Sequence, residues 1–424
     1  MTTTKNNEHK KLNFSSEREQ SQACLNSAEH EKNQGRKVLN VPNKQEQNQT
    51  CLDSAEREGL RPKGNVPNLR FPEFQGEWKE YRIEDITENI SSGRCKSHSS
   101  SGKYNLYGST GIIGKTNEAC YEGNLVLVAR VGANAGSLQI LNEPCGITDN
   151  TLIIKPKEVD VQYIYYFLQH FNLNRLIFGS GQPLITGGML KKVKVSLGTI
   201  QEQNKITRLL SVLDERIATQ NKIIEDLKKL KSAIIEKLYS EIQGKEYSFG
   251  QLFDVVNERN KQMEYSNILS ASQEKGMMNR DDLNLDIQFE RSNINTYKIV
   301  RKGDYVIHLR SFQGGFAFSN KLGVCSPAYT ILRPNNLLEY GYLSNYFTSQ
   351  RFIKSLILVT YGIRDGRSIN VDEWLRMKIT IPPKEHQQYI VKVIGTFERK
   401  IEDEEAYAAH LSKQKQYLLR QMFI

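Results

Sequence analysis

The chain has 424 residues, which is too long for one compact core and predicts two or three domains. No apolar run approaches the roughly 20 residues that cross a bilayer, and the polar N-terminus lacks the apolar segment of a signal peptide, so we expect a cytoplasmic protein. The net charge of +10 suits a nucleic-acid partner. Because the charge is spread thinly and forms no basic tail, any DNA binding has to come from folded surfaces.

Residues 1–68 are rich in Asn, Gln, Glu, Lys and Ser and poor in aromatic residues, so they predict a disordered leader that cannot bury enough apolar area to fold. The leader contains a local repeat. The sequence CLNSAE at 24–29 recurs as CLDSAE at 51–56, and NVPN at 40–43 recurs at 65–68. A duplicated, weakly folded leader is the favoured interpretation, and a partner-binding motif is the alternative.

Two segments, 69–196 and 245–383, predict mixed α/β domains. Residues 124–129 and 305–309 have the β-branched and aliphatic pattern of strands. Residues 163–168 and 343–347 predict short helices with aromatic core faces, and the glycine-rich stretches 108–111 and 132–136 predict turns.

A larger repeat decides the predicted architecture. Residues 201–239 match residues 385–423 with a constant shift of 184 and no gap, and Tyr81 at the start of the first domain corresponds to Tyr247, a shift of 166. The order is therefore leader, domain, central helix (197–244), domain and distal helix (384–424).

Both repeated segments are helical by period, with apolar residues at the alternating spacing of three and four that is typical of a coiled-coil seam. Each helix would be roughly 57 Å long at 1.5 Å per residue. We expect the two helices to pair antiparallel, with one domain at each end; the alternative is that each helix packs on its own domain. The residues predicted to pack the helices are Ile206, Leu210, Leu213, Ile217, Leu227, Ile390, Ile394, Phe397, Ile401 and Leu411.

One segment of the chain approaches a catalytic motif. Gly108–Thr116 ends like a phosphate-binding P-loop, but Ser109 stands where that motif needs glycine, so a glycine-built hairpin is the better interpretation. We find neither an adenine-methyltransferase motif nor an H-E-x-x-H pattern. The six cysteines form no C-x-x-C pair, and we expect them to be reduced and structural. These observations favour a scaffold without catalytic activity.

Base edges in the major groove are best contacted by Arg, Lys, Asn and Gln. Several such residues lie in glycine-flanked segments at matched places of the two repeats. The predicted DNA contacts are Lys115, Arg130, Asn134, Gln182, Arg310, Gln313, Arg364 and Arg367, with Lys191, Lys192 and Lys354 as phosphate contacts.

These patterns together resemble the specificity subunits of type I restriction-modification systems. The segment 66–78, VPNLRFPEFQGEW, looks like the family's entry sequence, and YGSTGIIG at 107–114 looks like a recurrent turn of its target-recognition domains. Each domain also closes with a hydrophobic strand that leads into a helix, near Gln201 and Glu385. The resemblance covers about 66–424 and does not extend to the leader.

The resemblance implies that two target-recognition domains each read one half of a split site in double-stranded DNA. It also implies that the helices set the spacing and dock two methyltransferase subunits, which flip and methylate an adenine in each half. Restriction subunits with motor and nuclease activity would complete the complex. The chain would have no cofactor of its own, because AdoMet, ATP and Mg²⁺ would be bound by the partners.

Two other functions remain open from the sequence. One is an autonomous DNA-acting enzyme, a nuclease or a nucleotide hydrolase, which would turn over without partners. The other is a coiled-coil scaffold with no DNA role, whose binding would depend on neither salt nor DNA sequence.

Overall fold

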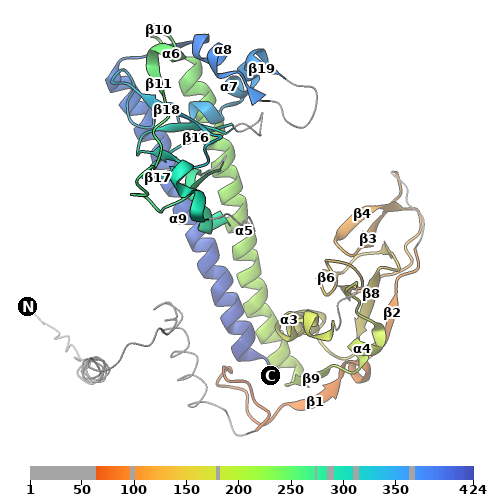
Figure 1. The fold of residues 1–424 in the computed structure, drawn as a ribbon. Coiled ribbons are helices and arrows are strands. Elements are labelled where there is room, and N and C mark those ends of the chain that lie inside the picture. Colours follow the sequence, from red (N-terminus) through yellow and green to blue (C-terminus); the bar gives the residue numbers. More distant parts are fainter. Residues whose placement is uncertain are drawn as a thin grey trace, which may run out of the picture. The chain divides into compact units, whose positions relative to one another are not determined.

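The computed structural model describes residues 64–95, 101–177, 182–272, 275–283, 291–308, 315–361 and 368–424. Gly64–Ile424 form one compact unit, which contains two α/β domains and two long helices (Figure 1). The predicted leader, 1–68, lies outside the described residues except for its last five positions.

Two long helices are the longest elements among the described residues. Helix α5 spans Ile200–Ser240 and helix α9 spans Lys384–Met422, which confirms the two helices predicted from the repeat. The Thr199 side chain caps the start of α5 by accepting a hydrogen bond from the Glu202 N–H. At 1.5 Å per residue α5 is about 62 Å long. No helix among the described residues is both long and apolar enough to span a membrane.

Helices α5 and α9 lie side by side and run antiparallel, as predicted (Figure 1). Ion pairs across the seam show the direction. Lys415 Nζ, late in α9, lies 2.6 Å from Asp214 Oδ1, early in α5. Lys231 Nζ, late in α5, lies 2.7 Å from Glu398 Oε1, early in α9. Residue numbers therefore fall along α9 as they rise along α5.

The seam has a local two-fold symmetry that follows from the repeat. The two lysines just named are 184 residues apart, and so are the two acids, so that one contact occurs twice. Between these pairs, the Gln220 side-chain amide donates hydrogen bonds to the carboxylate and the backbone carbonyl of Glu404. Glu404 is the repeat counterpart of Gln220, so the local two-fold axis crosses the helix pair beside this contact.

The first domain precedes α5 and contains two larger sheets and a two-stranded one. Its elements are β1 (Lys79–Arg82), η1 (Ile83–Ile86), β2 (Thr87–Ser92), β3 (Tyr104–Gly108), β4 (Gly111–Thr116), β5 (Leu125–Ala129), β6 (Leu138–Leu141), β7 (Cys145–Ile147), β8 (Thr151–Pro156), α3 (Val161–Phe171), η2 (Leu173–Leu176), α4 (Gly187–Lys191) and β9 (Lys194–Leu197).

The second domain lies between the two long helices. Its elements are β10 (Lys245–Ser248), α6 (Phe249–Leu252), β11 (Phe253–Val256), β12 (Leu269–Ser272), β13 (Gly276–Asn279), η3 (Arg280–Leu283), η4 (Arg291–Thr296), β14 (Lys298–Val300), β15 (Tyr305–Ile307), β16 (Phe316–Phe318), β17 (Gly323–Cys325), β18 (Thr330–Pro334), η5 (Tyr346–Thr348), α7 (Gln350–Ser355), η6 (Leu356–Val359), β19 (Thr360–Tyr361), β20 (Ser368–Ile369), α8 (Val371–Arg376) and β21 (Lys378–Ile381).

The two domains share the topology of one four-stranded sheet and of one strand pair, whereas their other sheets differ. The four-stranded antiparallel sheet has the order β2-β8-β5-β6 in the first domain and β11-β18-β15-β16 in the second. The first strand of each domain pairs with its last strand, so that Tyr81 lies opposite Val195 and Tyr247 lies opposite Ile379. The correspondence of Tyr81 with Tyr247 is the one that the sequence repeat predicted. The hairpin predicted at Gly108–Thr116 is also confirmed: β4 folds back on β3 through a turn between Gly108 and Gly111.

One predicted helix is wrong. Residues 343–345 form turns, and residues 346–347 begin the short 3-10 helix η5, whereas α3 in the first domain is a regular helix of 11 residues. The side chains of Ser344 and Thr348 donate to the carbonyls three residues before them. Such bonds compete with the regular helical hydrogen bonds, which explains the difference.

Each domain has its own hydrophobic core, and each core takes in parts of both long helices. The first core contains Ile206 from the start of α5 and Met422 from the end of α9. The second core contains Ile235 from the end of α5 and Ile390 from the start of α9. The pairing of the helices and the packing of each helix on its own domain, which the sequence offered as alternatives, therefore occur together.

The end of each helix is fixed by the same aromatic contact. Phe423, after α9, packs on Tyr163 and Phe167 of the first domain, with ring centroids 5.0 and 6.5 Å away. Its repeat counterpart Tyr239, in α5, packs on Tyr342 and Tyr346 of the second domain at 5.6 and 5.2 Å. The duplicated domains therefore hold the helix pair through duplicated contacts.

Candidate nucleic-acid interface

In the first domain, two segments that the sequence singled out lie against each other. An isolated β-bridge pairs Val131 with Leu184. The Gly132 N–H donates to the Pro183 carbonyl at 3.1 Å, and the Ile185 N–H donates to the Arg130 carbonyl at 2.9 Å. We call residues 130–137 and 182–185 the turn surface. It brings together three of the predicted DNA contacts, Arg130, Asn134 and Gln182.

The turn itself is built by its glycines. Gly132 and Gly136 have φ angles of +81° and +89°, which side-chain-bearing residues rarely adopt. The Ala135 N–H donates to the Gly132 carbonyl and the Ser137 N–H to the Asn134 carbonyl, which closes the loop on itself. The predicted turn at 132–136 is confirmed, and it leaves Asn134 exposed at its tip.

The three predicted contacts of this surface differ in exposure. Asn134 and Gln182 are exposed, so their amides are free to reach a ligand. Arg130 is half-buried, and its Nε is fully buried without a hydrogen-bond partner. Residues of similar predicted role therefore have different reach.

The predicted lysines are more scattered. Lys115 is exposed on β4, in the three-stranded sheet β4-β3-β7, and is not part of the turn surface. Lys191 is half-buried at the end of α4, and Lys192 follows it, exposed. Lys354 is exposed in α7 of the second domain. All four keep their predicted role as predictions.

The reading residues predicted in the second domain are Arg310, Gln313, Arg364 and Arg367, and all of them lie outside the described residues. The backbone on either side is described. His308 donates its N–H to the Gly315 carbonyl at 2.8 Å, and strands β19 and β20 pair on either side of residues 362–367.

Two residues of the first domain's candidate interface were not predicted from the sequence. The exposed Asn150 accepts the Arg130 N–H on its carbonyl at 2.9 Å, and Leu184 is 41% exposed within the turn surface. The polar pair Asp149-Asn150 between two strands was a usable signal. Leu184 gave none, because an isolated leucine predicts burial.

Most residues predicted to pack the helices are buried. Ile206 and Leu210 belong to the first domain's core, and Ile390 and Ile394 to the second's. Farther along the helices, Leu213, Ile401 and Leu411 are buried, whereas Ile217, Leu227 and Phe397 are half-buried.

The apolar pattern passed over four polar residues that lie on the same spacing of three and four. Gln220, Lys231, Glu404 and Lys415 all bond across the seam. Hydrogen bonds from Lys400 and Gln220 lower the pKa of Glu404. Polar residues at seam positions specify the alignment of paired helices.

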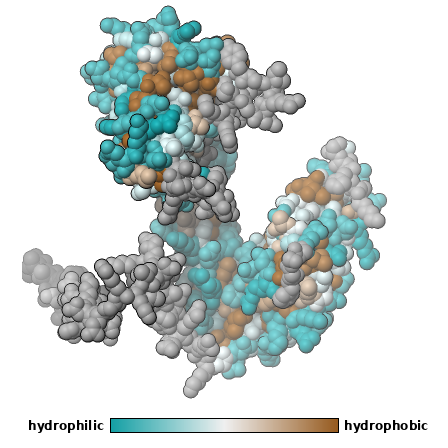
Figure 2. Space-filling model, in the orientation of Figure 1, coloured by the Kyte–Doolittle hydropathy of each residue, from teal (hydrophilic) through white to brown (hydrophobic). Residues whose placement is uncertain are grey.

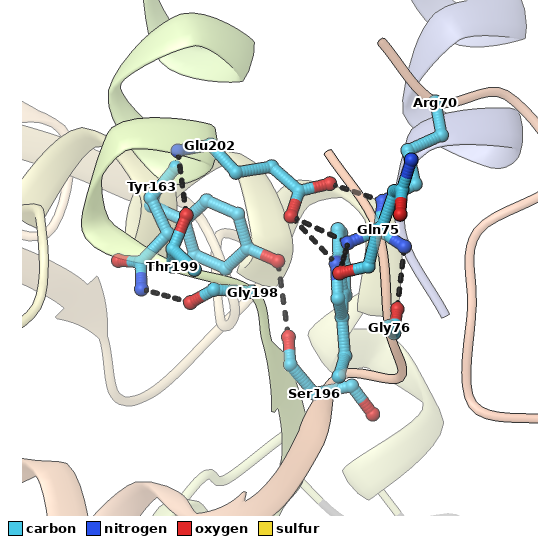
Figure 3. A network of polar contacts seen from close by, with 10 residues as sticks. Arg70, Gln75, Gly76, Tyr163, Ser196, Gly198, Thr199 and Glu202 are labelled. Carbon is cyan, nitrogen blue, oxygen red and sulfur yellow. Dashed lines mark hydrogen bonds and ion pairs between the residues drawn. The ribbon is translucent and has the colours of Figure 1, made fainter. Parts of the chain in front are cut away.

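A polar network joins the segment before β1 to the start of α5 (Figure 3). The buried Glu202 carboxylate accepts two hydrogen bonds from the Arg70 guanidinium, at 2.8 and 2.9 Å, and one from Trp78 Nε1 at 3.1 Å. Gly198 makes room for it, since a Cβ there would lie 2.4 Å from Glu202 Oε2. The Leu69 N–H also bonds to the Gln421 carbonyl of α9 at 2.8 Å. We call this network the clasp.

A buried glutamine repeats at the start of both helices. The Gln203 side chain donates to the Gly198 carbonyl at 3.0 Å, and Gln387 donates to the Pro382 carbonyl at 3.0 Å. Donor and acceptor are 184 residues later in the second case. The joints between strand and helix are therefore built alike in both domains.

Taken together, these features define a class of protein: a duplicated α/β module carried on one antiparallel helix pair, with loops of polar residues on each copy. A sequence profile described as "Type I restriction modification DNA specificity domain" matches residues 75–229 and 244–411. The match covers most of the chain and falls on both repeats. The chain belongs to this family.

Relatives and solved structures agree. The chain is 30% identical over 189 residues to the type I restriction enzyme MjaVIII specificity subunit of Methanocaldococcus jannaschii, which is 41% of this chain and 43% of that one. It is 24% identical over 172 residues to the type I restriction enzyme EcoprrI specificity subunit of Escherichia coli, 39% and 42% of the two chains.

The fold is similar to the crystal structure of a type I restriction-modification system S subunit from M. genitalium. The TM-score is 0.54 at 17% identity, over 85% of this chain and 99% of that one. A second structure, from work on complex assembly and conformational transition of the type I R-M system, gives a TM-score of 0.52 at 13% identity, over 81% and 96% of the chains.

Proposed function

We propose that this chain is the DNA sequence-recognition subunit of a type I restriction-modification complex, and that each domain contacts one half of a bipartite site. The observation that carries the proposal is the duplicated anchoring of the domains. One core takes in the start of α5 and the end of α9, and the other takes in the opposite ends. A helix pair held in this way acts as a ruler between two reading surfaces.

The length of the ruler suits DNA. Leu210 in the first core and Ile235 in the second are 25 positions apart on α5, which corresponds to about 38 Å. One turn of B-DNA measures roughly 34–36 Å. Two domains at this separation can approach successive major-groove segments on the same side of a duplex, which supports a split recognition site.

The helix pair also offers matched places for two copies of one partner. Ile223 on α5 is 40% exposed, and its repeat counterpart Tyr407 on α9 is 48% exposed. Exposed apolar residues at symmetry-related positions suit a partner that binds twice. We assign these places to two methyltransferase subunits. Restriction subunits would join the complete complex.

In this proposal the chain supplies no chemistry. Methyl transfer from AdoMet and ATP-driven, Mg²⁺-dependent cleavage belong to the partner subunits.

The surface seen in Figure 2 is mostly hydrophilic, with hydrophobic residues in separate patches on both domains. A surface of this kind suits a protein that meets DNA and partners through several limited contacts.

The decisive experiment combines the full-length chain with its methyltransferase partners and maps the methylated adenines in genomic DNA. We expect one bipartite sequence with a fixed gap, and a binding affinity that falls steeply with salt. Matched insertions in α5 and α9 should change the gap and leave both half-sites unchanged. Turnover of DNA or ATP by the chain alone, or binding without sequence preference and salt dependence, would contradict the proposal.

Partner docking has its own test. Ile223→Asp and Tyr407→Asp should each reduce the stoichiometry from two methyltransferase subunits to one, measured by light scattering of the assembled complex. Lys229→Asp, which changes an exposed charge of α5, serves as the control. Retention of two subunits by both variants would place the docking surface elsewhere.

A further inference from the structure

Arg130 is an unsatisfied cation in the turn surface. Within the described residues its guanidinium has no ion-pair or hydrogen-bond partner, although its Nε is fully buried. Burying part of a charged group without a partner is unfavourable, and structures tolerate it where a ligand supplies the missing charge. A guanidinium without an internal partner is suited to an anionic ligand.

The position of Arg130 limits what that anion is. The side chain is half-buried and its Nε is fully buried, so it does not extend freely from the surface. Base edges lie at the floor of a major groove that is roughly 8.5 Å deep, and an extended side chain is needed to reach them. Phosphates line the rim of the groove, where such a guanidinium can meet them.

The backbone of the same turn offers further donors. Among the described residues, the N–H groups of Ala133 and Asn134 have no acceptor within the chain, and both residues are exposed. The positive φ angles of Gly132 and Gly136 hold the loop in shape around them. Backbone N–H groups beside an arginine form a common phosphate contact in protein–DNA complexes.

We propose that Arg130, together with the N–H groups of Ala133 and Asn134, binds a DNA phosphate without regard to sequence. The exposed Gln182 beside it is then the residue of this surface that reaches base edges. The inference rests on the proposed function. It assigns two roles to the turn surface, one residue that positions the DNA and one that contacts its bases. It also revises the sequence-based role of Arg130, which was predicted to contact a base.

The test compares variants of the full-length chain bound to duplexes with the recognised sequence and with scrambled sequence, over a series of salt concentrations. Arg130→Gln should weaken binding to both duplexes alike, roughly tenfold near 0.1 M salt, and reduce the slope of log affinity against log salt by about 1. Arg130→Lys should retain part of the affinity, because it keeps the charge and loses the forked geometry.

Two controls separate this role from others. Arg82→Gln removes the same charge from β1, in a different sheet of the same domain, and should leave affinity and slope nearly unchanged. Gln182→Ala should relax base preference in one half-site and leave the slope unchanged. Arg130→Gln should not lower the melting temperature, since the side chain has no internal hydrogen-bond partner to lose.

The outcomes are distinct. A changed base preference in Arg130→Gln, or an unchanged affinity, overturns the phosphate assignment while leaving the proposed function intact. A lower melting temperature of Arg130→Gln also overturns it, because the residue would then be structural. Salt-independent binding by the wild-type chain overturns the proposed function itself.

Discussion

The two domains contact the helix pair through the same kinds of side chain. They differ in whether the chain itself connects the domain to the helix end beside it. Both place a buried glutamine at the start of the following helix and an aromatic ring at the end of the other helix. The second domain follows α5 directly, with residues 241–244 between the helix and β10. The first domain meets the end of α9 without a peptide connection, and the clasp holds that joint.

This comparison shows which contacts the repeat preserves and which it adds. Glu202 is the centre of the clasp, whereas its counterpart His386 is exposed and lies at a joint that the chain already closes. The non-covalent bonds of the clasp thus hold the first domain at the end of α9, whereas a short linker holds the second domain at the end of α5. The following predictions test how far the two joints differ.

The largest effect is expected for the clasp. Glu202→Ala leaves Arg70 and Trp78 without their acceptor and removes one partner of a buried ion pair, so we expect a loss of about 3–5 kcal/mol in the free energy of unfolding. His386→Ala, at the matched position, should change it by less than about 0.5 kcal/mol. Urea unfolding of both variants measures the difference. A loss for Glu202→Ala that is as small as the one expected for His386→Ala would show that the clasp is dispensable.

The aromatic anchors should come next. Phe423→Ala and Tyr239→Ala each remove a buried ring, and we expect each to cost about 3 kcal/mol. The losses should be local. Hydrogen exchange should quicken around Tyr163 in the first variant and around Tyr342 in the second. Faster exchange in both domains after either substitution would mean that the cores are not independent.

The ion pairs of the seam should contribute less. Lys231→Ala and Lys415→Ala remove the same contact from the two halves, and partial exposure of the acids limits each to about 0.5 kcal/mol. Lys415 also lies 5.3 Å from the ring centroid of Tyr166, so its loss should be slightly larger. Double-mutant cycles with Glu398→Ala and Asp214→Ala, respectively, isolate the two pairs.

The smallest expected effect is a pH dependence of stability that is confined to the first domain. Burial lowers the pKa of His170, and the nearby Arg175 lowers it further. His170 stacks on Phe423 at 5.9 Å, and its Nδ1 is buried without a partner. The folded state disfavours the charged imidazole, so His170 does not reduce the free energy of unfolding above its unfolded pKa of about 6.5. Below that pH the free energy of unfolding decreases, and the decrease continues as pH falls through the lower folded pKa.

Melting temperatures of the wild type and of His170→Gln between pH 7.5 and pH 5 test this point. The variant should show a flatter dependence on pH, and hydrogen exchange should place the acid-induced loosening in the first domain. Equal pH profiles of the two proteins would refute the assignment.

The sequence predicted the parts of the fold that depend on local periodicity. The constant shift of 184 residues predicted both helices, and their antiparallel pairing was expected from it. The correspondence of Tyr81 with Tyr247 predicted that the two domains begin alike, although not that each first strand pairs with the last. Periodicity of apolar residues could not reveal Gln220 or Glu404, because their polar side chains interrupt the pattern that defines the seam.

Contacts between distant residues were beyond the sequence argument. Glu202 binds Arg70, which is 132 positions earlier, and nothing in the local pattern of either residue indicates the other. Reach was equally hidden. Arg130 and Gln182 were grouped by residue type, and only burial separates them. Of the reading residues predicted in the second domain, none falls on described positions, so their role stays a prediction.

The offset between the repeats varies along the chain. It is 166 at the first strands, 179 from Tyr163 to Tyr342, and 184 throughout the helices. Insertions and deletions have thus accumulated inside the domains, while the supporting frame has kept its length. The interior of a domain could therefore be exchanged for that of a relative, and the exchanged domain would still meet the same contact residues on the helix pair. Such an architecture lets new specificities arise by recombination without redesign of the whole assembly.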